Sequence, residues 1–227
     1  MTAESSRLGD IVRSHLGSER AVVALRRYFG LEGGAPYTGA RFELLGGGGD
    51  RGGVADVVTA EDLVAVQMLS VTVPGRVSLD LLEGDLGQQM SRLLPEMPRE
   101  LDMADAEAGE LESGSAAEWA WDLLDAQHGV GWVTAGKLLA RKRPRLVPVY
   151  DRVVRCVLGS PSSFWLDLHR ALRADGHALH HELLDLRERA GIPETVSALR
   201  VCDVVLWMAH HEDHRPLRCA GHGTISG

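Results

Sequence analysis

Cysteine is scarce in this 227-residue chain, which contains only Cys156, Cys202 and Cys219. No two of them form a Cys-x-x-Cys pair, and three sulfurs are too few for a four-cysteine iron–sulfur cluster or zinc site. A chain of this length buries roughly 70 % of its unfolded surface without the support of disulfides. We therefore expect three buried free thiols and a reducing, cytoplasmic environment.

A long apolar segment is also lacking. No run of apolar residues approaches the roughly 18 residues that a membrane-spanning helix needs. The first residues, Met-Thr-Ala-Glu-Ser-Ser-Arg, do not resemble a signal peptide. The sequence predicts an intracellular protein that neither crosses a membrane nor is secreted, and we expect a monomer.

Lysine is nearly absent, because the basic residues are 22 Arg and 2 Lys, and the net charge is −8. An acidic average argues against a polyanionic partner, since phosphate binding draws its affinity from cations that displace condensed counterions. The charge is unevenly distributed, however. No Lys or Arg occurs between Glu100 and Gly136, whereas residues 137–155 carry seven bases and one acid. This stretch predicts either a face that attracts phosphate or a solvated basic helix end.

Helical periodicity is the main pattern along the chain, and it predicts a mainly α-helical fold. Thr59 precedes an almost wholly apolar segment and has the position of an N-cap, with a carboxylate three residues later. Residues 33–53 contain two glycine-rich stretches on either side of residues 37–45, and they predict a mobile loop around a short extended piece. The second stretch lacks the Lys-Ser/Thr ending of a phosphate-binding loop, so we do not expect it to bind a nucleotide. The only candidate strand is 146–149. Helices are expected within 8–29, at 59–72, at 77–94, from 119, and at 161–175, 177–190 and 193–211.

The segment 128–141 carries the most specific signal. Gly129 and Gly131 flank the apolar Val130 between two helical patterns, which predicts a tight turn with Val130 packed inward. Such a turn leaves backbone amides unpaired at the start of the second helix, where the helix dipole also favours phosphate. The structural alternative is an ordinary connection between two helices.

Residues 146–155 read Leu-Val-Pro-Val-Tyr-Asp-Arg-Val-Val-Arg, an apolar segment that ends at the carboxylate of Asp151. Together with the Gly-Val-Gly turn, this order resembles the helix-hairpin-helix superfamily of DNA glycosylases (HhH-GPD), in which Pro-Val-Asp opens a later helix. Val133 occupies the position that holds a lysine in the bifunctional members of the superfamily. Asp151 lies 18 residues after Val133, which is the usual interval in the superfamily between this position and the aspartate. The resemblance covers about 55–212 and is specific at 128–155. The wider sequence also resembles a family of single-domain actinobacterial proteins.

The resemblance implies N-glycosidic bond hydrolysis in double-stranded DNA, on a base turned out of the duplex. Asp151 would stabilise positive charge on the sugar and orient water, with Tyr150 beside it in the pocket. Val133 replaces the family's lysine, so the activity would be monofunctional and need no cofactor; Lys137, one turn further on, is left as a displaced amine. The DNA-binding residues implied are Gly129, Gly131, Trp132, Thr134, Lys137, Arg141, Lys142, Arg143, Arg145 and Arg152.

The predicted organisation has three parts: N-terminal helices and the glycine-rich loop at 1–54, the helix-hairpin-helix domain at 55–212, and a flexible tail at 213–227. An alignment on Pro148-Val149 would place Tyr150 rather than Asp151 at the catalytic position, and an Asp at a helix start is also an ordinary N-cap. Two other functions stay open: a non-catalytic DNA-binding module, or a helical protein acting on a non-DNA ligand or a protein partner. Four tryptophans are expected in the core: Trp119, Trp121, Trp165 and Trp207.

Histidines are concentrated near the C-terminus. His210 and His214 would lie on one helical face, and Cys219 and His222 would complete a tetrahedral zinc site. The glycine-rich tail that follows favours a solvated helix end instead. The sequence therefore predicts no metal.

Overall fold

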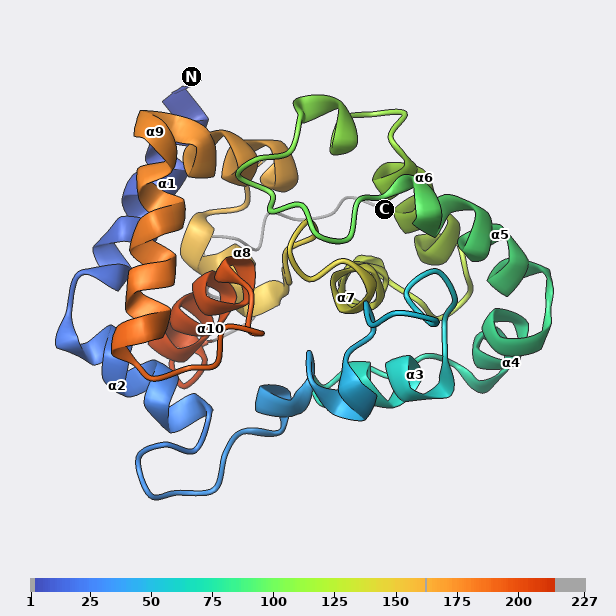
Figure 1. Cartoon of the computed structure of the whole chain (residues 1–227), viewed down its shortest axis with the longest axis horizontal. Helices are drawn as coiled ribbons and strands as arrows, with labels where there is room; N and C mark the ends of the chain where they lie inside the picture. Colours follow the sequence, from blue (N-terminus) through green and yellow to red (C-terminus); the bar gives the residue numbers. More distant parts are fainter. Residues whose placement is uncertain (1–2, 162, 215–227) are drawn as a thin grey trace. The chain divides into compact units, whose positions relative to one another are not determined.

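The computed structural model describes residues 3–161 and 163–214, and these residues form helices, turns and irregular segments without a strand (Figure 1). The prediction of a mainly α-helical chain is confirmed. The strand expected at 146–149 is absent, because the amides of Leu146 and Val147 both bond back to the Arg143 carbonyl and form a turn. None of the helices described is both long and apolar enough to cross a membrane.

The chain divides into two compact units whose bounds differ from the predicted parts. The terminal unit combines Met1–Pro36 with Tyr150–Gly227, and the central unit is Tyr37–Val149. The terminal unit is thus built from both ends of the chain. A linear reading of composition has no signal for such a pairing, since it depends on contacts between distant segments.

The terminal unit is organised around its last helix. α10 (Ala198–His210) contacts α1, α2, α8 and α9, and its residues from Ala198 to Leu206 are all buried. α1 packs along α9, as Figure 1 shows. The helices around α10 are α1 (Ala3–Leu16), α2 (Glu19–Tyr28), α8 (Arg152–Leu158) and α9 (Phe164–Arg189).

Helix α9 contains the break that the sequence predicts between two helices. Backbone angles leave the helical region from Ala174 to His177, and Asp175, Gly176 and His177 all have positive φ. α2 lies within the expected range 8–29, and α10 begins five residues later and ends one residue earlier than the expected range 193–211. The periodic apolar positions therefore located α2, α9 and α10, whereas a helix opening at Asp151, here α8, was implied only by the resemblance.

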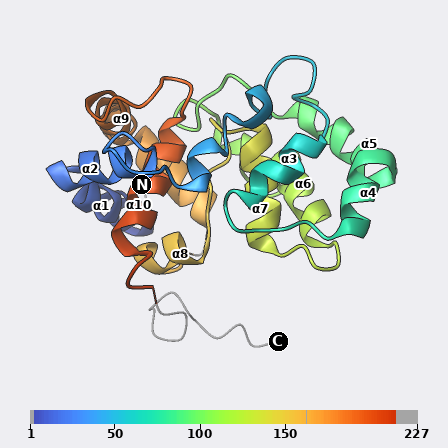
Figure 2. The same cartoon turned by 90° about the horizontal axis from the view of Figure 1, so that it is seen from below.

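The central unit places α7 against α6 and α3 (Figure 2). Every residue of α7 from Thr134 to Lys142 is buried, so this helix is the core element of the unit. The helices are α3 (Ala60–Gln67), α4 (Gly75–Glu83), α5 (Asp85–Leu93), α6 (Ala116–Asp125) and α7 (Trp132–Lys142), with short 3₁₀ turns at Thr38–Arg41, Leu45–Gly47, Leu94–Glu96 and Ala108–Glu110.

Local chemistry explains where these helices start and stop. The Thr59 hydroxyl accepts from the Asp62 amide and the Asp62 carboxylate accepts from the Thr59 amide, so the predicted N-cap is confirmed as a full capping box. α3 ends at Gln67 rather than Thr72, since Ser70 takes φ +60°. The helix expected at 77–94 is two helices that meet at Gly84, whose extended backbone ends α4.

The tryptophans are less buried than expected. Trp119 on α6 is 57 % exposed, so its assignment to the core is wrong. Trp121, Trp165 and Trp207 are each half-buried. The core of both units is instead formed mainly by Leu, Val, Ala and Met.

Candidate functional site

The glycine turn joins α6 to α7 as the sequence predicts. The Val130 amide bonds to the Gln127 carbonyl, and the Val130 side chain is buried. Gly129 has φ +82°, a conformation that an L side chain rarely adopts, and a Cβ there would lie 2.8 Å from Cγ of Pro74. Both the backbone and the neighbouring Pro74 thus require glycine at this position.

Gly131 is the N-cap of α7 and takes an extended conformation. It has no side chain to bond the first amides of the helix, and nothing lies within 4 Å of the position that its Cβ would occupy. Trp132 is half-buried and Thr134 is buried just behind the turn. The start of α7 therefore combines a positive dipole end with space for a small group.

The helix that leads into this turn is acidic. α6 carries Glu118, Asp122 and Asp125 and no basic residue. Partial burial, with a smaller contribution from the charge of Asp122, raises the pKa of Asp125 above its ordinary value. An anion bound at the turn would thus have carboxylates on the neighbouring helix, which reduces its attraction.

The far end of α7 places two cations in the protein interior. Arg141 and Lys142 are each 1 % exposed, and both bond to the equally buried Asp62 of α3. Nε of Arg141 donates to Oδ1 at 3.0 Å, and Nζ of Lys142 donates to Oδ2 at 2.8 Å. Burial lowers the pKa of Lys142, and the charge of Asp62 opposes this effect. One carboxylate therefore compensates two buried cations and also closes the N-cap of α3.

Arg143 follows the same pattern. Its guanidinium is buried and donates to the carbonyls of Ala55, Leu94 and Met97, and to the carboxylate of Asp56 at 2.6 Å. Burial lowers the pKa of Arg143 from its usual value, while Asp56 acts in the opposite direction. The expectation that Arg141, Lys142 and Arg143 form a basic surface is corrected, because all three side chains are buried and bonded inside the central unit.

Lys137 is also turned inward. Its side chain is buried, and Nζ donates to the carbonyl of Leu69 at 2.9 Å, just beyond the end of α3. This bond joins the second turn of α7 to the segment 69–72, which the resemblance assigns to a DNA-facing loop. Lys137 therefore acts here as a structural donor, which differs from the surface contact expected of it.

Two of the expected basic residues are accessible. Arg145 keeps a half-exposed side chain and forms a two-point ion pair with Asp102. Arg152, at the start of α8 in the terminal unit, is exposed. These two arginines are the ones in the predicted set whose charge reaches the surface.

The glycine-rich loop lies over the buried cations of the central unit. Arg141 donates to the carbonyls of Phe42, Glu43 and Leu45, and Arg51 donates to the carbonyl of Gly48 at 2.6 Å. A Cβ at Gly49 would lie 2.4 Å from the Arg141 carbonyl oxygen and 2.8 Å from Asp62. The expectation of a mobile loop is replaced by a bonded segment in which glycine permits close packing.

Asp151 belongs to the terminal unit, where it is the N-cap of α8. Its Oδ1 accepts from the amides of Val153 and Val154 at 2.9 and 3.1 Å. Tyr150 stacks on Phe164 with ring centroids 3.9 Å apart, and burial raises the pKa of its hydroxyl well above the usual range. Burial therefore favours the neutral form of the Tyr150 hydroxyl.

The cysteines differ from the three buried free thiols expected. Cys202 is free and buried, and burial raises the pKa of its thiol to about 12. Cys156 on α8 is half-buried and disulfide-bonded. Cys219 and His222 lie outside the described residues. Sequence reasoning missed Asp62 as the partner of the buried cations, and its capping position was the only local signal of its importance.

The structure thus defines a helical protein of two units, one of which contains a glycine-bridged helix hairpin. Residues 21–210 match a family whose description reads "Family of unknown function (DUF6308)", and the chain belongs to this family. No curated protein and no solved structure matches the chain. The family description names no activity, so the functional assignment depends on the chemistry of the site.

Proposed function

We propose that the protein binds double-stranded DNA through the turn between α6 and α7, as a helix-hairpin-helix, DNA-glycosylase-like protein. The observation that carries this proposal is the turn itself: Gly129 has positive φ, Val130 is buried, and the start of α7 has no capping side chain. Backbone amides at such a helix start bind phosphate oxygens without sequence preference.

The buried cations make the proposed binding weakly dependent on salt. Each phosphate that a protein neutralises changes the slope of log K against log salt by about −0.9. Lys137, Arg141, Lys142 and Arg143 are buried and do not contribute, whereas Arg145 and Arg152 are accessible. A slope between about −1 and −3 is therefore expected for duplex DNA, well below that of a protein with an extended basic surface.

A pair of substitutions at Gly131 tests the hairpin. Gly131→Asp and Gly131→Asn both supply a good N-cap in a position with extended backbone and free space, so both should preserve folding. Only the aspartate adds a negative charge where the phosphate would lie. Fluorescence anisotropy at low salt should show duplex binding by wild type and Gly131→Asn and a loss of about tenfold or more with Gly131→Asp, a difference of about 1.4 kcal/mol. Equal affinity of the two variants would contradict the proposal.

We infer a hydrolytic step at Asp151 as the catalytic part of the same proposal. Water would add to the sugar carbon while the bond to the base breaks, and the proton that the water loses would pass to the departing base. The carboxylate would stabilise the positive charge that develops on the sugar. Asp151→Asn keeps an acceptor for the Val153 and Val154 amides and removes the charge. Release of free base from duplexes with alkylated, deaminated or oxidised bases should occur with wild type and fall by at least about 100-fold with Asp151→Asn.

One observation favours a non-catalytic DNA-binding module as the second candidate. Oδ1 of Asp151 is already bonded to two backbone amides, which is a complete structural role for this side chain. This candidate predicts the same response to the Gly131 variants and no base release from any duplex. A third function, action on a non-DNA ligand or a protein partner, would show no duplex binding even at low salt.

A further inference from the structure

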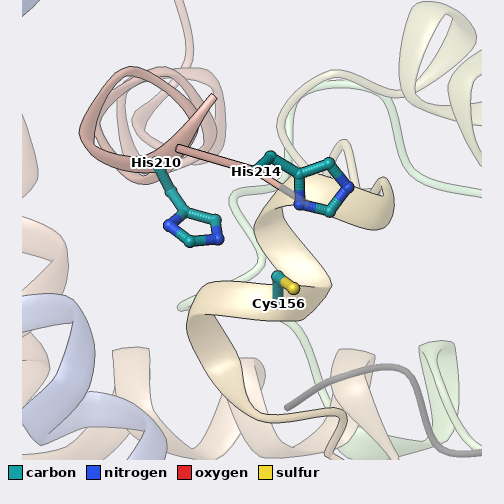
Figure 3. Close-up of side chains that lie close together, drawn as sticks. All are labelled: Cys156, His210 and His214. Carbon is teal, nitrogen blue, oxygen red and sulfur yellow. The ribbon is translucent and has the colours of Figure 1, made fainter. Parts of the chain in front are cut away.

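Three metal-ligating side chains meet in the terminal unit at a place unrelated to the hairpin. Cys156 lies on α8, His210 is the last residue of α10, and His214 follows four residues later. One ligand atom of each lies within 4.8 Å of the other two, and Figure 3 shows the side chains facing a common space. All three are half-buried, so an ion could reach them from solvent.

The cluster is formed by packing and not by a helical repeat. α10 ends at His210 and residues 211–213 form a turn, so the two histidines do not share a helical face as expected from their spacing. Their ring centroids nevertheless lie 5.8 Å apart. α8 contacts α10, which brings Cys156 to the same place from 54 residues earlier in the chain.

The ligand set has the chemistry of a zinc site. Imidazole nitrogen and thiolate sulfur are the donors that Zn²⁺ prefers, with distances of about 2.0–2.1 Å and 2.3 Å from the metal. In a tetrahedral site these distances place neighbouring donors about 3.3–3.6 Å apart. Donors now within 4.8 Å need to approach by about 1 Å, a movement within reach of rotations about the side-chain bonds.

We propose that Cys156, His210 and His214 bind one Zn²⁺ ion in the reduced protein, with a fourth position open to water or another donor. A disulfide and a metal compete for the same sulfur, and Cys156 is disulfide-bonded in this structure. The zinc form therefore requires prior reduction by a thiol or phosphine reductant. The ion would link the end of α10 to α8 and so stabilise the packing of these two helices.

Cobalt titration of the full chain, without a histidine tag and with a phosphine reductant, tests the site directly. Co²⁺ should bind one equivalent per chain, with the ligand-field bands of four-coordinate cobalt and a thiolate-to-cobalt charge-transfer band. Zn²⁺ should displace it. Cys156→Ser should abolish the charge-transfer band, and His210→Gln or His214→Gln should weaken Zn²⁺ binding by more than the 10- to 100-fold typical of removing an outer-shell partner.

Matched controls separate this site from general thiol or imidazole binding. Cys202→Ser removes the buried free thiol of α10, and His211→Gln removes the imidazole stacked on Trp207; both should retain the cobalt spectrum. If Cys156→Ser does not fold, X-ray absorption of the zinc-loaded wild type should still show one sulfur and two nitrogen ligands. Sub-stoichiometric binding, a zinc shell without sulfur, or equal binding by the oxidised protein would overturn the proposal.

Discussion

The two ends of α7 differ in their exposure to solvent: its start is exposed and its end is buried. At its start, Gly129 and Gly131 are exposed to solvent. At its end, Arg141 and Lys142 are withdrawn from solvent and bonded to Asp62. The basic residues that follow the glycine turn are thus buried in the central unit, where they bond to Asp62. A run of positive charge in a sequence is therefore no measure of positive charge at the surface.

The difference between these ends lies in what each requires of its neighbours. The turn depends on residues adjacent in sequence and on one contact with Pro74. The buried end depends on a carboxylate 79 residues away, on the carbonyls of the glycine-rich loop, and on close packing at Gly49. Substitutions at the buried end should therefore affect stability most strongly.

The largest effect is expected from Asp62→Asn. This change leaves Arg141 and Lys142 buried without a counter-charge, and the free energy of unfolding should fall by about 3–5 kcal/mol. Asp56→Asn is the control, because only one buried cation, Arg143, loses a carboxylate and Asp56 itself is 46 % exposed; a smaller loss of about 1–3 kcal/mol is expected. Urea unfolding followed by circular dichroism measures both. Equal losses would show that burial of the pair does not decide the effect.

A smaller effect is expected in the glycine-rich loop. Gly49→Ala places a methyl group against the Arg141 carbonyl and Asp62, and overpacking of this kind costs about 1–3 kcal/mol. Gly52→Ala, three residues away, meets nothing within 4 Å and should be neutral or stabilising by up to about 1 kcal/mol. The melting temperature of Gly49→Ala should therefore fall below that of wild type, whereas that of Gly52→Ala should stay the same or rise. If the loop were mobile, the two variants would have similar melting temperatures.

At the open end of α7 the expected effect is smaller again. Gly129→Ala forces an L residue into a left-handed conformation, at a cost of about 1–2 kcal/mol, and presses against Pro74. Gly131→Asn should change the free energy of unfolding by only a few tenths of a kcal/mol, since asparagine is a good N-cap. Urea unfolding of the two variants measures this difference, and the midpoint of Gly129→Ala should be the lower of the two. Similar midpoints would argue against the left-handed geometry at Gly129.

The smallest effect is a pH dependence at Lys142. Its pKa is lowered in the folded protein, so unfolding takes up a proton at pH values between the folded pKa and the ordinary value of about 10.4. The contribution of Lys142 to the free energy of unfolding therefore rises with pH through this window. Lys142→Met lacks the titrating group, and the stability of wild type relative to this variant should increase as the pH rises toward the ordinary lysine pKa of about 10.4. A constant difference would mean that the pKa is not lowered.

Local features of the fold could be predicted from the sequence, and long-range ones could not. The capping box at Thr59, the Gly-Val-Gly turn and the break in α9 all depend on a few adjacent residues. The burial of Arg141–Arg143 depends on partners at Asp56 and Asp62, and the Cys156 cluster depends on the packing of α8 against α10. No periodicity or motif encodes these pairings in a single sequence.

The same distinction explains the errors at the candidate site. Gly129, Gly131 and Asp151 occupy the local structures expected of them, a turn and a helix cap. Lys137 was expected at the surface because it lies in a basic stretch, but it donates to Leu69 inside the unit. Trp119 was expected inside because tryptophan is usually buried, and it is exposed on α6.

The construction of the terminal unit from both ends of the chain also constrains its synthesis on the ribosome. The central unit, Tyr37–Val149, has all its residues available before α8, α9 and α10 have emerged. Until then the apolar sides of α1 and α2, with Val12, Leu16, Val22 and Leu25, have no α9 or α10 to cover them. The nascent chain thus carries an uncovered helical pair through most of its translation, and exposed apolar surface of this kind favours aggregation until α9 and α10 emerge.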